Sequence, residues 1–379
     1  MARGSVRKLD GAWGYRIDLG PDPATGRRRQ YSKQGFRTKR AAETALAELT
    51  TDAQNGAIPA RTGRTLGDFL DEWIVLQQDR LRATTLYSYE IAVDRIKRSI
   101  GHTKLQAITP LQLEKFYAFL IKDGGVAGNG LSPKTVRNTH TVLRKALSDA
   151  ERLGLVGRNA AASARAPSDD RTESVTWSSD QMRSFLDHVA TDRLYAAYIL
   201  LATTGMRRGE VLGLRWRDVD FDGRELAVAN TLTTAGKRGV IAGPPKTPRS
   251  RRQIYLDDGT LAVLRERRAA QNAERLAAGP DWNSESDYVF TNEIGDYKHP
   301  DRFSQEFRRH VDAAELPYVR LHDLRHSYAT LALKAGVHPK VVSERLGHAT
   351  VGITLDLYSH VTPSIARDAA DVVASQILG

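Results

Sequence analysis

The sequence contains no cysteine among its 379 residues. This absence excludes a disulfide scaffold, thiolate zinc sites, iron–sulfur clusters and cysteine nucleophiles. The chain also lacks any run of about 18 uninterrupted apolar residues, which excludes a transmembrane helix. The charged N-terminus has no apolar stretch behind it, so we expect no secretory signal and a protein that stays in the cytoplasm. We find no internal repeat and no low-complexity tract.

Positive charge is what the sequence has in excess. It carries 56 Lys and Arg residues against 45 Asp and Glu residues, a net charge of +11, and its pI is near 9.8. A pI above about 9 suggests a polyanionic partner such as nucleic acid, although charge alone also fits a soluble protein that happens to be basic. Residues 1–60 hold 11 basic and 6 acidic residues, so nearly half of the excess lies in the first sixth of the chain.

The length predicts two or three domains at about 150 residues per domain. In the first segment, Trp13, Tyr15 and Ile17 alternate as in a half-buried strand, a second strand starts at Arg27, and residues 38–54 form an Ala-rich helix. A small basic sheet with one helix is a plausible DNA-reading module, because strands can enter the major groove. A small module for some other partner is the alternative.

Two linkers separate this segment from two further domains. Residues 56–64 and 161–176 are small and polar or rich in Gly and Pro. Between them the apolar period is helical, and Ser132 followed by Pro133 begins the last of its helices. We expect a first helix that begins at Thr65 and three further helices over about 84–99, 110–122 and 132–153. Beyond the second linker we expect helices at 179–189 and 192–203, strands around 218–256, and then mostly helices.

Two candidate cationic sites lie in the last 200 residues. Gly205 suits the end of one helix, and Arg207 then stands at the start of the next, expected over 210–216, where its guanidinium could reach an anion and Glu210 could brace it. Lys246 lies in a tight turn within residues 243–255 and could protonate a leaving alkoxide. Taken singly, these residues also fit a solvated arginine pair and a surface lysine.

Further candidates follow on the next helices. His322 and Arg325 are three residues apart in a helix expected over 321–331, so they share a face and could grip one phosphate, while His326 is expected to point away. Gly347 ends a helix and presents His348, and Tyr358 follows ten residues later. An amphipathic helix and a core tyrosine are the ordinary alternatives, and the pattern assigns no role to His360.

The order of these residues along the chain is more specific evidence of function than any one of them. The Thr-Gly-x-Arg-x-x-Glu, His-x-x-Arg and Leu-Gly-His…Tyr motifs resemble those of the tyrosine recombinase, or phage integrase, family of three-domain type. The resemblance implies an arm-type DNA-binding domain over 1–57, a helical core-binding domain over 65–160 and a catalytic domain over 175–379. It implies a multidomain α+β fold: a small N-terminal sheet plus helix, an all-α domain, and a mostly α catalytic domain with a small antiparallel sheet.

The family resemblance also implies a site-specific recombinase that integrates a phage or mobile element. Tyr358 would attack a DNA phosphorus and form a 3′-phosphotyrosine, so that neither ATP nor a metal is needed. Arg207 and Arg325 would stabilise charge on the phosphate. No cofactor is expected.

Four other residues complete the implied site. Lys246 would protonate the leaving 5′-oxygen, and His322 would assist proton transfer at the tyrosine. His348 would donate a hydrogen bond to the phosphate, and Glu210 would hold Arg207 in a supporting role.

The implied partner is double-stranded DNA with core-type and arm-type attachment sites, bound by a homotetramer at the nucleoid of a bacterial host. An excisionase and a host DNA-bending factor are further candidate partners, and no membrane is involved. An amphipathic helix over 363–378 is expected to dock on a neighbouring protomer, with folding back on its own domain as the alternative.

Three other functions stay open from the sequence. Asp218, Asp220 and Asp222 could ligate a cation as in a metal nuclease, although the exposed side of a strand explains them as well. A type IB-like topoisomerase would use the same tyrosine chemistry without joining two sites. A DNA-binding architectural protein could retain the scaffold without catalysis.

Overall fold

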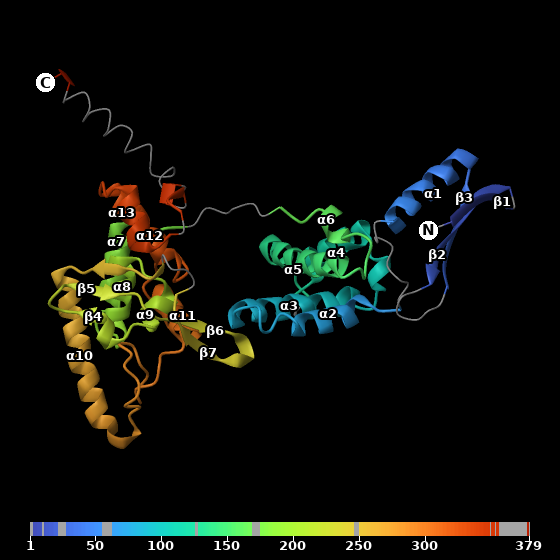
Figure 1. Ribbon diagram of the computed structural model, residues 1–379. Coiled ribbons are helices and arrows are strands. Elements are labelled where there is room, and N and C mark those ends of the chain that lie inside the picture. The colour runs from blue at the N-terminus through green and yellow to red at the C-terminus, as the bar shows by residue number, and fades with distance from the viewer. Residues whose placement is uncertain are drawn as a thin grey trace. The chain divides into compact units, whose positions relative to one another are not determined.

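The computed structural model divides the chain into two compact units, residues 1–171 and 172–379 (Figure 1). It describes residues 3–9, 11–21, 28–54, 63–125, 128–168, 175–245, 250–348, 350–352, 354–355 and 377–378. No helix within these ranges is long and apolar enough to cross a membrane.

The first unit begins with a sheet module, residues 3–54. Strands β1 (Arg3–Leu9), β2 (Ala12–Pro21) and β3 (Arg28–Phe36) form an antiparallel sheet in the order β1-β2-β3. Helix α1 (Lys39–Gln54) lies across one face of the sheet (Figure 1), and that face buries Tyr15 and Ile17. The alternation predicted for β2 is therefore confirmed.

Strand β1 was not predicted. It has no regular alternation of apolar and polar residues, and it gains its strand conformation by pairing along its whole length with β2. The opposite face of the sheet is polar and basic. Since side chains alternate across the pleat, the exposed residues there are Ser5, Arg7, Arg16, Gln30 and Ser32.

A helical domain over residues 63–168 completes the unit. Its helices are α2 (Leu66–Val75), α3 (Ala83–Ile100), α4 (Pro110–Asp123), α5 (Pro133–Arg152) and α6 (Ala160–Ser163), with a 3₁₀ turn at Leu105–Ala107. Thr65 caps α2 in a capping box with Asp68, and Ser132 caps α5 directly before Pro133. The helix boundaries predicted for α3, α4 and α5 are confirmed to within one residue.

The core of the helical domain contains one buried polar link between its first and last long helices. The indole Nε1 of Trp73 on α2 donates to Oδ2 of Asp149 on α5 at 2.9 Å, and both residues are buried. Burial would raise the pKa of Asp149, but the hydrogen bonds from Trp73 and Arg152, with the nearby charge of Lys145, outweigh it and lower the pKa. The carboxylate thus stays charged inside the domain.

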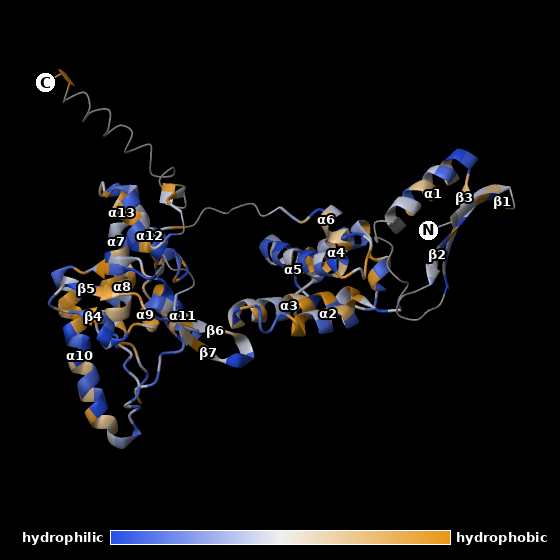
Figure 2. Ribbon diagram, in the orientation of Figure 1, coloured by the Kyte–Doolittle hydropathy of each residue, from blue (hydrophilic) through white to orange (hydrophobic). Residues whose placement is uncertain are grey.

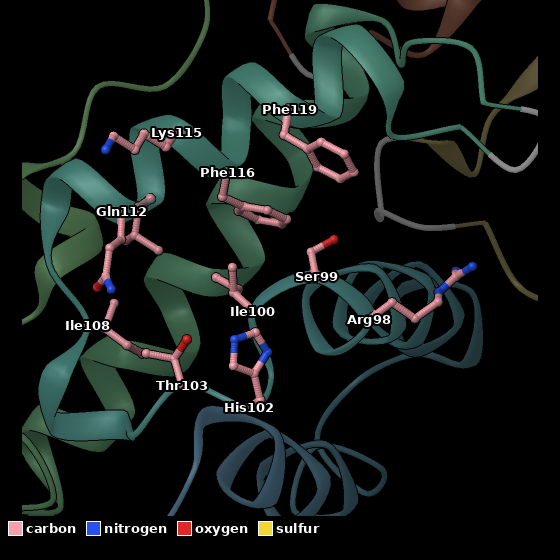
Figure 3. A pocket seen from close by; sticks show the side chains of 11 residues that line it. Arg98, Ser99, Ile100, His102, Thr103, Ile108, Gln112, Lys115, Phe116 and Phe119 are labelled. Atoms are coloured by element: carbon pink, nitrogen blue, oxygen red, sulfur yellow. The ribbon is translucent and has the colours of Figure 1, made fainter.

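An open pocket of about 580 Å³ lies between the end of α3 and α4. Figure 3 shows Phe116 and Phe119 on α4 facing Ile100 and His102 across it. Arg98 and Lys115 stand at its edge, so the pocket has an apolar floor and a basic rim. It contains none of the predicted site residues.

The second unit, referred to as the C-terminal unit, is mostly helical. Its helices are α7 (Ser179–His188), α8 (Tyr195–Thr204), α9 (Arg208–Leu212), α10 (Asp258–Ala278), α11 (Pro300–Ala313), α12 (Asp323–Lys334) and α13 (Pro339–Leu346). Strands β4 (Val219–Asp220), β5 (Glu225–Ala227) and β8 (Gln253–Tyr255) form one antiparallel sheet, and β6 (Thr231–Thr234) pairs with β7 (Val240–Gly243) in a separate hairpin.

Helix α8 is the centre of this unit. Its residues are hydrophobic on all sides (Figure 2), as expected for a helix surrounded by protein. Tyr198 stacks on Phe303 of α11 and meets Phe185 of α7 edge to face, each with ring centroids 5.2 to 5.3 Å apart. The predicted multidomain α+β fold is confirmed, with two small β elements in this unit where one sheet was expected.

The predicted helix over 210–216 is wrong beyond Leu212. The backbone of Trp216 donates to the carbonyl of Asp287 at 2.9 Å, and that of Val289 donates to Leu214 at 3.0 Å. Pairing with this distant segment therefore extends the chain where local periodicity favoured a helix. The helix predicted over 321–331 begins instead at Asp323 and runs to Lys334.

We predict that Trp73→Phe lowers the free energy of unfolding of the helical domain by about 1–3 kcal/mol, because Asp149 loses a buried donor. Hydrogen exchange of α5 amides in urea would measure the loss. Trp216→Phe removes an indole from the C-terminal unit and serves as the control. Unchanged α5 protection in Trp73→Phe would contradict the prediction.

Candidate active site

The end of α8 and the start of α9 place Arg207. Gly205 ends α8 in the left-handed conformation, with φ of 64°, and a Cβ there would lie 2.5 Å from Leu346 and 2.6 Å from Tyr328. Only glycine therefore allows the turn to pack so closely against α12 and α13. Arg207 follows at the N-cap of α9, as predicted, with its side chain 36% exposed.

The carboxylate of Glu210 is shared by two arginines. It accepts hydrogen bonds from the backbone N–H of Arg207 at 2.9 Å and from Nη1 of the same residue at 2.7 Å. Nη2 of Arg252 donates to its Oε2 at 2.9 Å, and Nη1 donates to its Oε1 at 3.3 Å. Burial would raise the pKa of Glu210, but the hydrogen bonds and charges of the two arginines outweigh it and lower the pKa.

Arg325 is a buried cation at the start of α12. Its Nη1 donates to the carbonyl of Gly205 at 2.8 Å, and its Nη2 donates to that of Leu346 at 2.6 Å. Burial, reinforced by the charge of Arg207, lowers the pKa of Arg325 to about 9, so it remains charged at neutral pH. Two arginines from different parts of the chain thus lie close enough for the charge of Arg207 to act on Arg325.

Three successive carbonyls at the end of α13 each accept a hydrogen bond from a different arginine. Arg252 Nε bonds the carbonyl of Arg345 at 2.6 Å, Arg325 bonds that of Leu346, and Arg207 Nη2 bonds that of Gly347 at 3.3 Å. The carboxyl end of a helix carries partial negative charge and leaves its last carbonyls without helical partners. The end of α13 therefore gathers the cations of the site.

His348 follows this helix end, and its Nδ1 lies 2.8 Å from the hydroxyl of Thr354. Burial, with the charges of Arg325 and Arg207, lowers the pKa of His348 to about 4. Burial, with His326 and Arg325, lowers the pKa of His322 to about 4 as well. Both imidazoles are therefore neutral at pH 7.

The prediction that His326 points away from His322 is wrong. Their rings meet edge to face with centroids 5.3 Å apart. Residues four apart lie on the same side of a helical turn, and His322 occupies the N-cap position of α12. Burial lowers the pKa of His326 too.

A cleft of about 520 Å³ opens beside Arg207 and His322. It is bordered by basic and aromatic side chains: Arg208, Arg308, Tyr318 and Arg320. Arg308 lies over the ring of Tyr318 at 5.5 Å, and Arg320 is held by Asp323 through two hydrogen bonds of 2.8 and 2.9 Å. The cleft extends the positive charge of the site along the surface of the unit.

Several predicted residues lie outside the described residues. These are Lys246, Tyr358 and His360, together with the helix predicted over 363–378 apart from its residues 377 and 378. The structure therefore brings together Arg207, Glu210, Arg325, His322 and His348.

Arg252 was missed by the sequence reasoning. It lies in the basic run that follows Lys246, where it looked like one of several surface arginines. Its side chain is only 7% exposed, and its partners Glu210 and Arg345 are distant in sequence. The only local signal was a charged residue directly before the short strand β8.

The alternative of a metal site at Asp218, Asp220 and Asp222 gains no support. Asp220 closes a turn by accepting hydrogen bonds from the backbone of Asp222 at 3.0 Å and Gly223 at 2.9 Å. Across the described parts of the chain, no group of three or more His, Asp or Glu residues could hold a metal ion.

An arginine pair braced by a buried carboxylate, with neutral imidazoles beside it, suits an enzyme that acts on a phosphate diester. In a multidomain α+β chain this arrangement is typical of the class of DNA strand-transfer enzymes. Comparison with known families is consistent with that class. Residues 176–364 match the phage integrase family, residues 5–53 an arm DNA-binding domain, and residues 65–121 the N-terminal SAM-like domain of phage integrases.

The chain belongs to the phage integrase family, and the prediction of a tyrosine recombinase is confirmed. It is 29% identical over 356 residues to a XerC-like tyrosine recombinase of Caldanaerobacter subterraneus subsp. tengcongensis, covering 89% of this chain and 90% of that protein. It is 28% identical over 374 residues to the ICEBs1 integrase of Bacillus subtilis, covering 97% and 98%.

Solved structures share the fold. The Tn1549 transposon integrase, in complex with a circular intermediate DNA, has a TM-score of 0.68 at 20% identity, covering 82% of this chain and all of that one. A lambda integrase dimer bound to a core site has a TM-score of 0.57 at 18% identity, covering 93% of each chain.

We predict that the C-terminal unit loses stability as the pH falls from about 6.5 to 5. An unfolded histidine has a pKa near 6.5, whereas those of His322 and His348 are about 4 in the folded unit. Between these values the unfolded chain binds more protons, so the free energy of unfolding decreases with falling pH.

Urea denaturation of the full chain at pH 7, 6 and 5 would measure this dependence. The variant carrying both His322→Gln and His348→Gln should show a flatter dependence, since neither position can then take up a proton. A slope equal to that of the wild type would contradict the assignment of neutral imidazoles.

Proposed function

We propose that this chain is a site-specific recombinase of a phage or mobile element, which cleaves and rejoins strands of duplex DNA with Tyr358 as its nucleophile. The observation that carries the proposal is that Arg207 and Arg325 both bond the end of α13, with neutral His348 directly after that end and neutral His322 beside Arg207 in the cleft. His348 lies ten residues before Tyr358 in the chain.

The proposed reaction exchanges one phosphodiester for another. The phenolic oxygen of Tyr358 attacks the phosphorus, the bond to the 5′-oxygen breaks, and a 3′-phosphotyrosine and a 5′-hydroxyl result. Attack by the 5′-hydroxyl of a partner strand reverses these bonds and releases the tyrosine. Because the covalent link conserves the phosphodiester bond, the cycle needs no ATP and, on this proposal, no metal.

Each proposed site residue has a role in this reaction. Arg207 and Arg325 bind the non-bridging oxygens, where negative charge develops. A neutral His322 can accept the phenolic proton, which a protonated imidazole could not do. Lys246 supplies a proton to the departing 5′-oxygen, and Glu210 orients Arg207.

His348 donates a hydrogen bond to the phosphate. A neutral imidazole carries one N–H, so the Thr354 hydroxyl must donate to Nδ1 if Nε2 is to carry that proton. The contact between these two residues is compatible with the tautomer that this proposal requires.

The DNA partner is engaged by more than the site itself. The cleft beside Arg207 lies where the backbone next to the reacting phosphate would pass, and its arginines would bind that backbone. Residues 65–160 would bind the core-type site, and the sheet module over 1–57 would bind a separate arm-type site through its polar basic face. Residues 175–379 would form the catalytic domain.

We further propose a homotetramer on DNA, with the segment 363–378 docking on a neighbouring protomer. A lambda integrase of the same fold has been solved as a tetramer bound to a Holliday junction. An excisionase and a host DNA-bending factor are candidate accessory partners. An enzyme acting on a bacterial chromosome would work at the nucleoid, in the cytoplasm.

We predict that Tyr358→Phe retains salt-sensitive DNA binding and loses strand cleavage, because the phenyl ring has no oxygen to attack phosphorus. The measurement incubates wild type and variant in EDTA with DNA spanning the attachment region of the source element, quenches with SDS, and detects protein joined to a 3′ end. An adduct from both proteins would overturn the assignment of Tyr358.

The same assay separates the alternatives. Relaxation of plasmids that lack an attachment site would favour a topoisomerase. Salt-sensitive binding by the wild type without any adduct on cleavable DNA would favour an architectural protein.

We predict that deleting residues 1–57 spares binding to core-type DNA and weakens recombination. The deletion removes the polar basic face of the sheet and leaves the contact between Arg207 and Glu210 intact. Electrophoretic binding assays on core-type DNA, with recombination assays on full-length sites, would measure both effects. Recombination at the wild-type rate would contradict the arm-binding assignment.

A further inference from the structure

Arg252 bonds the end of α13, as Arg207 and Arg325 do, but its side chain is withdrawn from solvent. Its side chain is 7% exposed, compared with 36% for Arg207. It makes hydrogen bonds in three directions: to both oxygens of Glu210, to the carbonyl of Arg345 and to the carbonyl of Ser250. A side chain held in this way is poorly placed to bind DNA itself.

The partners of Arg252 belong to two different parts of the site. Glu210 orients Arg207, while Arg345 belongs to α13, whose next two carbonyls accept from Arg325 and Arg207. Arg252 therefore fixes the carboxylate of Glu210 against the end of α13. Without it, Glu210 would have hydrogen bonds to Arg207 alone among its described partners, and the two could rotate together.

The chemistry of this link requires a guanidinium. Its rigid planar fork can bond a carboxylate through two nitrogens while the third donates elsewhere. An ammonium group at this position would carry the same charge but could not bond both Glu210 oxygens and the Arg345 carbonyl with a fixed geometry. Buried ion pairs of this kind are weak evidence of a contribution to stability, which favours a role in geometry.

We propose that Arg252 is a positioning residue for strand transfer, which holds Arg207 in register with the reacting phosphate through Glu210 and uses the end of α13 as its anchor. This inference rests on the proposed function. It makes Arg252 part of the apparatus that aims charge at the transition state, without contact with DNA.

The first test compares Arg252→Met and Arg252→Lys with the wild type. We expect single-turnover formation of the covalent adduct to slow by about 10- to 100-fold in Arg252→Met, with DNA affinity within about threefold of wild type. We expect Arg252→Lys to recover less than the full rate, because it restores charge but not the fork. Full recovery by Arg252→Lys would overturn the proposal.

The second test separates positioning from a general loss of structure. A methylphosphonate at the reacting position replaces a charged oxygen with a methyl group, so the transition state depends less on Arg207. If Arg252 acts through Arg207, the rate deficit of Arg252→Met should shrink on this substrate, as should that of Arg207→Met. An equal deficit on both substrates would show that Arg252 only supports the fold, and would overturn the proposal.

Arg251→Met is the matched control, since Arg251 is the exposed neighbour of Arg252 in the same run. Its ratio of rates on the two substrates should equal that of the wild type. Circular dichroism and DNA binding verify that each variant is folded. If the wild type forms no adduct on either of the two substrates, the proposed function is overturned. If the wild type reacts and Arg252→Met reacts at the same rate, only this inference is overturned.

Discussion

The buried carboxylate of Glu210 is the interaction on which the arrangement of the site depends. A single negative charge accepts hydrogen bonds from Arg207 and Arg252, with Arg325 close by. Three guanidinium groups could not gather here without a counter-charge, because each repels the others and burial adds a cost to every one. Glu210 supplies that charge without lining the cleft, whereas Arg207 does line it.

The end of α13 supplies the remaining compensation. Its last carbonyls carry partial negative charge and would otherwise lack partners, so they bind the same arginines that Glu210 only partly neutralises. The surplus positive charge then acts on the histidines. It combines with burial to keep His322 and His348 neutral, which is the state that the proposed proton transfer to His322 requires.

The sequence predicted the helix starts and bounds that depend on interactions between neighbouring residues. Thr65 and Ser132 begin helices because their side chains cap the first turn. The bounds predicted for the helices at 84–99, 110–122 and 132–153 agree with the structure within one residue. Contacts between distant segments could not be predicted in this way. Pairing of residues 214–216 with 287–289 ended a helix early, and Arg252 looked like a surface residue because its partners lie about 40 and 90 positions away. The position of His326 was misjudged, although helix geometry alone would have placed it beside His322.

The shared contacts also mean that the site behaves as one unit. Arg207, Glu210, Arg252 and the end of α13 form a closed set in which each group is held by at least two others. Residues in one hydrogen-bonded network show coupling energies of about 0.5–3 kcal/mol, and effects on catalysis are strongly non-additive when residues act together. Loss of one arginine therefore changes the position of the others, and its cost cannot be assigned to its own contact with phosphate. Gly205 adjoins this set, because its carbonyl accepts from Arg325 and a Cβ there would press on the side chains of Leu346 and Tyr328, which pack against the turn.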